Sequence, residues 1–157
     1  MRFTATAGSG HQVTLDAAVA DGGQDGGFRP IEMLLVGLAG CTGMDVITIL
    51  RKKRQLVTDY EVRVEGIRAE DHPMVFLEIN VEHIITGYEL QPQAVEQAIR
   101  LSEERYCGVG AMLGKTAHIT NCFRLIDAEM PKSLAQTGTN AITLLDAGIQ
   151  ESSLPQD

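Results

Sequence analysis

The feature that most constrains the fold is a long, mostly apolar run at residues 30–54, which reads PIEMLLVGLAGCTGMDVITILRKKR. Pro30 suits the first turn of a helix, and Glu32 suits the positive end of the helix dipole. Apolar residues fill nearly every position of 33–39, and a helix that is apolar all round is a buried helix. We therefore expect a central helix over residues 30–54, with Cys41 near its middle and the rest of the chain folded around it.

Three glycines interrupt this predicted helix at positions 37, 40 and 43. Each costs about 1 kcal/mol relative to alanine inside a helix. Their clustering around Cys41 indicates either a kink or the close approach of another backbone or helix.

The segments around the run alternate in polarity and predict strands. Residues 3–7 and 11–17, separated by a Gly-Ser-Gly break, predict a β-hairpin, and the glycine-rich residues 21–27 predict a mobile connector. Residues 60–67 and 77–85 predict antiparallel strands with one wet face. Residues 92–106 predict an amphipathic helix ending at Cys107, and residues 116–126 a last strand containing Cys122.

The resulting fold class is α+β, with antiparallel sheets packed around the long central helix, in a single domain of residues 1–127. The hairpin takes residues 1–20, the central helix 30–54, and the remaining sheet and helix 58–127. Residues 128–157 form a mostly polar tail, in which 141–149 could be a short helix or strand.

Charge and composition exclude several classes of function. A net charge of −8 disfavours nucleic acid and anionic membrane surfaces as partners. The N-terminus lacks a secretory signal, and the stretch between Glu32 and Asp45 is shorter than the about 20 residues of a membrane span. We therefore expect a soluble, cytoplasmic protein, in which three cysteines do not form a disulfide framework. With no CxxC or HExxH motif, a metal site could arise only by convergence in space.

The cysteines are the candidates for chemistry. Cys41 in an apolar helix could be an inert buried residue, and Asp45 one turn further on would raise its pKa if the two side chains were close. Cys107 ends a helix beside small residues, so two thiols distant in sequence could be neighbours in space. One could then attack a peroxide as a thiolate, and the other could condense with the sulfenic acid to give a disulfide. Cys122, inside an alternating strand, is assigned a structural role.

Two motifs resemble a known family. Residues 30–46 match P-x-E-M-L-L-x-x-L-A-G-C-T-x-M-D-V, and residues 104–107 read E-R-Y-C. Together they resemble the superfamily of osmotically induced protein C and organic hydroperoxide resistance proteins (OsmC/Ohr), over about residues 1–127. Within it, the chain is most similar to the general OsmC-like subgroup.

The resemblance implies an intertwined homodimer in which two central helices pack together between two sheets, with active sites at the subunit interface. It implies a peroxidatic Cys41 and a resolving Cys107, an organic hydroperoxide as substrate, and a small or protein dithiol as reductant. It implies no metal and no organic cofactor.

The family's peroxidases also use an acid–arginine pair to activate the thiol. Their glutamate lies ten residues before the cysteine, where this chain has Ile31, and their arginine lies in the hairpin turn, where this chain has residues 8–11, GSGH. The candidates for these roles are therefore Glu32, with Arg29 or Arg2. Two alternatives stay open: a non-catalytic protein that binds an apolar ligand or a thiol partner, with Cys41 protonated, and a family member whose cysteines are only structural.

Overall fold

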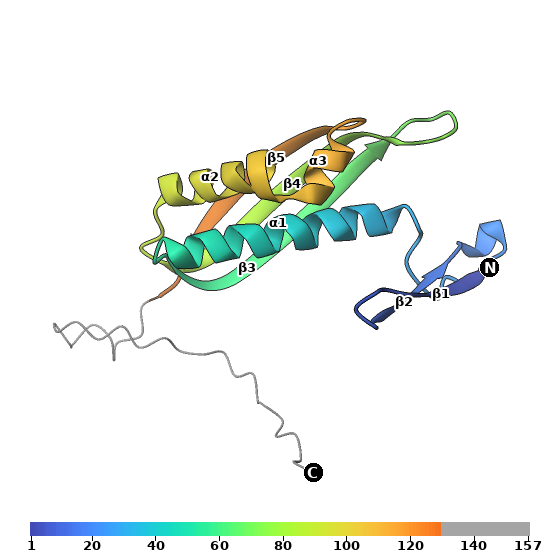
Figure 1. The fold of residues 1–157 in the computed structure, drawn as a ribbon, viewed down its shortest axis with the longest axis horizontal. Coiled ribbons are helices and arrows are strands. Elements are labelled where there is room, and N and C mark those ends of the chain that lie inside the picture. Colours follow the sequence, from blue (N-terminus) through green and yellow to red (C-terminus); the bar gives the residue numbers. More distant parts are fainter. Residues whose placement is uncertain (130–157) are drawn as a thin grey trace, which may run out of the picture.

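The computed structural model describes residues 1–129, and the expectation for residues 141–149 lies outside them. The N-terminal hairpin is present as β1 (Arg2–Thr6) and β2 (Gln12–Asp16), paired antiparallel. A short 3₁₀ turn, Val19–Asp21, and the glycine-rich connector lead to the long helix. In Figure 1 the hairpin lies beyond the N-terminal end of that helix, apart from the larger sheet.

The central helix α1 spans Glu32–Lys52, two residues shorter at each end than expected. At its start, the Glu32 carboxylate accepts a hydrogen bond from the Arg29 backbone N–H at 2.8 Å. At its end, Arg54 adopts a left-handed backbone with φ of 56°, which a continuing helix does not allow.

A three-stranded sheet lies behind a layer of helices (Figure 1). Strand β3 (Leu56–Arg68) pairs antiparallel with β4 (Phe76–Tyr88), as the alternation predicted. Strand β5 (His118–Asp127) pairs with β4 in parallel, so the expectation of purely antiparallel sheets is wrong. The connection from β4 to β5 crosses over through helices, and such a crossover returns the chain in the same direction.

That crossover holds three helical segments. Helix α2 (Pro92–Leu101) continues into a wider π-helical turn, η2 (Ser102–Tyr106), and α3 (Gly108–Leu113) follows Cys107. The predicted helix over residues 92–106 is thus two segments, and α3 was not predicted. The Cys107 sulfur caps α3 by accepting a hydrogen bond from the Gly110 backbone N–H at 3.2 Å.

The core between sheet and helices divides into two apolar clusters. One joins the C-terminal half of α1 to α2, with Val46, Leu50 and Ile85 at its centre. The other joins the N-terminal half of α1 to α3, and it includes Leu38 and Cys107. Cys41, near the middle of α1, therefore packs against the cluster that contains Cys107.

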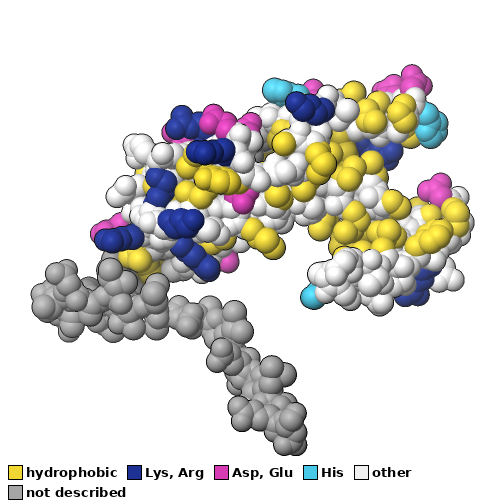
Figure 2. All heavy atoms as spheres, viewed as in Figure 1, with side chains coloured by type: hydrophobic (Ala, Val, Ile, Leu, Met, Phe, Trp, Pro, Cys, Tyr) yellow, Lys and Arg dark blue, Asp and Glu magenta, His cyan; other side chains and the backbone are white. Residues whose placement is uncertain are grey.

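One side of α1 remains uncovered in the single chain, so its expected complete burial is not present there. Leu34, Val36 and Met44 are exposed, and a Cβ on Gly37 or Gly40 would meet nothing within 4 Å. Hydrophobic side chains gather over α1 and on the nearby face of the hairpin in Figure 2. This is the surface on which the resemblance predicts a second subunit.

The observed length of α1 also changes the membrane argument. Its 21 residues, with a mean hydropathy of 1.9 over the most apolar window, would suit a membrane span by length and composition alone. The core helix of a soluble protein passes the same test. The expectation that the apolar stretch is too short to span a membrane is therefore wrong. The packing of α1 against α2 and the sheet is instead the observation that favours a core helix.

Candidate functional site

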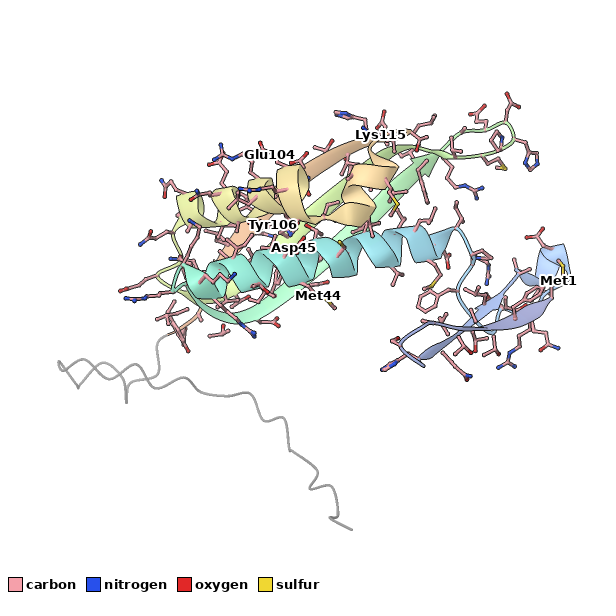
Figure 3. The ribbon with its side chains drawn as sticks, in the orientation of Figure 1. Met1, Met44, Asp45, Glu104, Tyr106 and Lys115 are labelled. Carbon is pink, nitrogen blue, oxygen red and sulfur yellow. The ribbon has the colours of Figure 1, made fainter. Side chains whose placement is uncertain are left out.

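The structure brings Cys41 and Cys107 together, as expected for a thiol pair. The Cys41 sulfur, the Cys107 sulfur and a carboxylate oxygen of Asp45 all lie within 4.8 Å of one another. Cys41 and Asp45 are one turn apart on α1 and therefore share a face. In Figure 3, Asp45 points from α1 toward the segment that carries Tyr106, whereas Met44 points to the opposite side.

The π-helical turn positions Cys107. In an α-helix, each residue is rotated by about 100° about the axis from the residue before it. The π-helical turn is wider, so it changes the direction in which Cys107 points compared with a continued α2. The turn is closed by a hydrogen bond from the Cys107 backbone N–H to the Ser102 carbonyl at 2.8 Å. Cys107 then faces the core with 4% of its surface exposed, while the adjacent Tyr106 is 55% exposed.

A buried hydroxyl pair ties the acid of the site to the same turn. The Ser102 hydroxyl donates to the Asp45 carboxylate at 3.1 Å and lies 3.2 Å from the Thr42 hydroxyl. Both Ser102 and Thr42 are buried, and both come from faces that are otherwise apolar. Sequence reasoning did not assign them a role, although a serine on the apolar face of a predicted helix was a usable signal.

The two thiols differ in environment. Cys107 is buried whereas Cys41 is half-buried. Burial, followed by a hydrogen bond to Cys41, raises the pKa of the Cys107 thiol to about 11. Cys107 is therefore mostly protonated at neutral pH. In that state it can donate a hydrogen bond, and it must lose its proton before its sulfur can act as a nucleophile.

A cavity of about 380 Å³ opens beside Cys107. Its apolar wall comes from α1, α3 and β5, with Leu38, Ala111, Ala117 and Ile119. Its polar wall contains Thr42, Glu103, Lys115, His118 and Asn121. Lys115 is the lysine of this lining, and within residues 1–129 no arginine contributes to it.

The cavity adjoins a buried polar group in the sheet. His83 is fully buried, with Nδ1 2.6 Å from the Tyr60 hydroxyl and Nε2 3.4 Å from the Asn121 side-chain oxygen. Burial lowers the pKa of His83, so the ring is neutral. The network connects the cavity wall to the sheet without placing a charge there.

The predicted activating residues lie elsewhere in the chain. The Arg29 guanidinium donates hydrogen bonds to the Asp25 carboxylate and to the Gly27 carbonyl, the latter at 3.1 Å. Glu32 is nine residues before Cys41 on the same helix, a rise of about 14 Å. Arg2 lies on exposed β1, opposite Asp16. Within one chain, none of the three is brought to the cysteines.

Cys122 lies on β5 and is exposed, apart from the other two cysteines. It gives the chain a thiol outside the site, useful as an internal control.

Comparison with known proteins places this geometry in a family. A family model described as "OsmC-like protein" matches residues 22–121. Protein YhfA from Escherichia coli K12 is 38% identical over 128 residues, which cover 82% of this chain and 92% of YhfA.

Solved structures agree in fold. A hypothetical protein from Aquifex aeolicus is 29% identical, with a TM-score of 0.68 and coverage of 82% of this chain and 97% of that one. The organic hydroperoxide resistance protein OhrB of Bacillus subtilis shares the fold at 15% identity, with a TM-score of 0.55 and coverage of 79% and 96%. The match over residues 22–121, which contain the α1 motif and Cys107, shows that the chain belongs to the OsmC-like protein family.

Proposed function

We propose that this protein is a thiol-dependent peroxidase that reduces organic hydroperoxides, with Cys41 as the peroxidatic and Cys107 as the resolving thiol. The observation that carries the proposal is the approach of the two sulfurs to within 4.8 Å. A disulfide requires about 2.05 Å between sulfurs. Rotation of the two side chains with a small shift of the π-helical turn can supply that closure.

The burial of the two thiols supports the division of roles. The thiolate is the reactive form of cysteine. Cys107 is buried with a pKa of about 11, so it is held as the thiol, while half-buried Cys41 is open to a substrate. The second step needs a thiol that waits beside the first sulfur and loses its proton as it attacks; Cys107 occupies that position.

The chemistry balances with these two residues and a dithiol. The Cys41 thiolate attacks the distal oxygen of the hydroperoxide; the O–O bond breaks, and the alkoxide takes a proton to leave as the alcohol. Cys41, now a sulfenic acid, is attacked by the Cys107 sulfur; an S–S bond forms and water leaves. A dithiol then exchanges with the disulfide, restoring both thiols and becoming oxidised itself.

Assembly as a homodimer would supply the activating arginine and glutamate that a single chain does not bring to Cys41. The uncovered glycine-containing side of α1 and the exposed apolar residues Phe3 and Phe28 of the hairpin region support such an assembly. In it, the hairpin region of a second subunit would carry Arg29 or Arg2, with Glu32, toward the site. Lys115 lines the same cavity as Cys107 and is a further candidate cation.

The name of OhrB agrees with this activity, while that of YhfA indicates none. We place the reaction in the cytoplasm, as the sequence predicts, with no nucleic acid or membrane partner.

A turnover assay tests the proposal. Cumene hydroperoxide is supplied with dithiothreitol or dihydrolipoamide, and loss of peroxide is followed for the wild type and three variants. Cys41→Ser is expected to abolish turnover. Cys107→Ser is expected to slow it, because the dithiol must then react directly with the Cys41 sulfenic acid. Cys122→Ser is the matched control and is expected to keep the wild-type rate. Turnover by Cys41→Ser at the wild-type rate would contradict the proposal.

One observation favours a second function, the binding of an apolar ligand without catalysis. The cavity beside Cys107 has one apolar wall, and its volume falls in the range of small-molecule sites. In that case Cys41 stays protonated, and its alkylation by iodoacetamide at pH 6 is no faster than that of a free thiol. Faster alkylation would exclude this second function.

A further inference from the structure

The same three side chains form a potential metal-binding set that the peroxidase chemistry does not require. Two sulfurs and one carboxylate oxygen, from Cys41, Cys107 and Asp45, lie within 4.8 Å of one another. Tetrahedral zinc with about 2.3 Å bonds to sulfur holds two sulfurs about 3.8 Å apart. The cluster therefore needs a contraction of about 1 Å or less to enclose an ion.

The backbone around the cluster is suited to holding ligands in place. Cys41 and Asp45 are fixed one turn apart on a 21-residue helix, and Cys107 is fixed by the turn that caps α3. Two of the ligands already have outer hydrogen-bond partners: Ser102 donates to the Asp45 carboxylate and Gly110 to the Cys107 sulfur. Such outer partners orient ligands and are typical of metal sites.

The donor types select the ion. Thiolates favour zinc, copper(I) and iron–sulfur clusters, whereas magnesium and calcium prefer oxygen ligands alone. Zinc also accepts a carboxylate in a tetrahedral set, and it has no redox chemistry of its own. Cys41 and Asp45 are half-buried, so water has access as the fourth ligand.

We infer that the reduced protein binds one Zn²⁺ per chain through Cys41, Cys107 and Asp45. Two thiolates and a carboxylate carry three negative charges against the two positive charges of the ion. The exposed Cys122 takes no part. Binding does not depend on the proposed peroxidase activity.

Zinc and peroxide would compete for the same sulfurs; this consequence alone rests on the proposed function. In the zinc form, both thiolates are ligands. Their oxidation by a hydroperoxide transfers two electrons to the O–O bond, and two protons from solvent complete the alcohol and water. The product disulfide offers no thiolate, so Zn²⁺ leaves unchanged.

The experiment titrates the reduced full chain with Zn²⁺ in competition with a chromogenic chelator, and with Co²⁺ as a spectroscopic substitute. We expect one ion per chain, with a near-ultraviolet sulfur-to-cobalt charge-transfer band and the visible bands of a tetrahedral ion. Cys41→Ser, Cys107→Ser and Asp45→Asn are each expected to weaken binding. Ser102→Ala is expected to weaken it about 10-fold or more, as loss of an outer partner does.

Cys122→Ser is the control, with unchanged affinity and spectrum. Circular dichroism of each variant separates loss of a ligand from loss of the fold. Absence of the charge-transfer band from folded wild-type protein, or its persistence in folded Cys41→Ser/Cys107→Ser, would overturn the inference. Peroxide turnover is measured separately, on chelator-treated protein. A failure of zinc binding and a failure of the proposed peroxidase function then give different results.

Discussion

The Cys107 thiol should ionise at a pH about two units higher than an ordinary thiol, and its rate of alkylation measures this difference directly. In Cys41→Ser/Cys122→Ser, Cys107 is the only cysteine, so alkylation reports on it alone. Burial is the main cause of its raised pKa and persists in this variant, whereas the smaller effect of the Cys41 hydrogen bond is lost.

The magnitude follows from the shift. A thiol with the reference pKa of 9.0 is about 1% ionised at pH 7, and one with a pKa of about 11 is about 0.01% ionised. The thiolate is the form that reacts, and part of the shift is lost with Cys41. Cys107 in this variant should therefore be alkylated by iodoacetamide up to about 100-fold more slowly at pH 7 than the same residue in the urea-unfolded chain.

The pH profile separates ionisation from simple shielding. A raised pKa makes the folded rate rise tenfold per pH unit up to about pH 10, beyond the point at which the unfolded rate levels off. Shielding alone lowers the rate by a constant factor and leaves the midpoint near 9. A folded profile with its midpoint near 9, with circular dichroism showing an intact fold, would refute the environment that we assign to the resolving thiol.

Three further predictions concern the core, the sheet and the uncovered helix side. Leu50→Ala is expected to lower the free energy of unfolding by about 3 kcal/mol because Leu50 is fully buried. Leu56→Ala, at a position that is 51% exposed, should lower it by less than about 1 kcal/mol. Urea unfolding compares the two variants, and equal losses would contradict the observed packing. Folding lowers the pKa of His83, so the contribution of His83 to stability is complete above its unfolded pKa of 6.5 and is lost as the pH falls below 6.5. His83→Gln should therefore make the free energy of unfolding less dependent on pH below 6.5. An unchanged dependence would count against a neutral buried imidazole. A Cβ at Gly40 has room in the single chain, but the larger side chain of Gly40→Leu would obstruct the second helix of the proposed homodimer. Sedimentation should then give a dimer for the wild type and a monomer for the variant, and an undisturbed dimer would exclude this side of α1 as the interface.

Much of the fold was predictable because local patterns and tertiary packing agree. The hairpin, α1, the strands β3 to β5 and α2 all follow from periodicity and from Gly and Pro punctuation. Helix α3 was missed because residues 108–114 contain three glycines, which have low helix propensity. It forms through the cap from Cys107 and packing against α1, and neither is visible in local sequence.

The site was predictable in its cysteines and less so in its surroundings. The family resemblance implied that Cys41 and Cys107 meet, and the helical spacing of Asp45 placed it on the same face as Cys41. The π-helical turn that orients Cys107 changes the helical period for one turn only, so no periodicity reveals it. The roles of Arg29, Arg2 and Glu32 stay predictions, because they depend on how a second chain is placed rather than on the packing of this one.

The most direct measurement of the central claim is intact-mass analysis with peptide mapping after one equivalent of cumene hydroperoxide is added to the fully reduced protein. The account predicts a loss of two hydrogens per chain and a cross-linked peptide pair joining Cys41 to Cys107, with Cys122 still reduced. A reduced mass after peroxide exposure, or oxidation confined to Cys122, would contradict it.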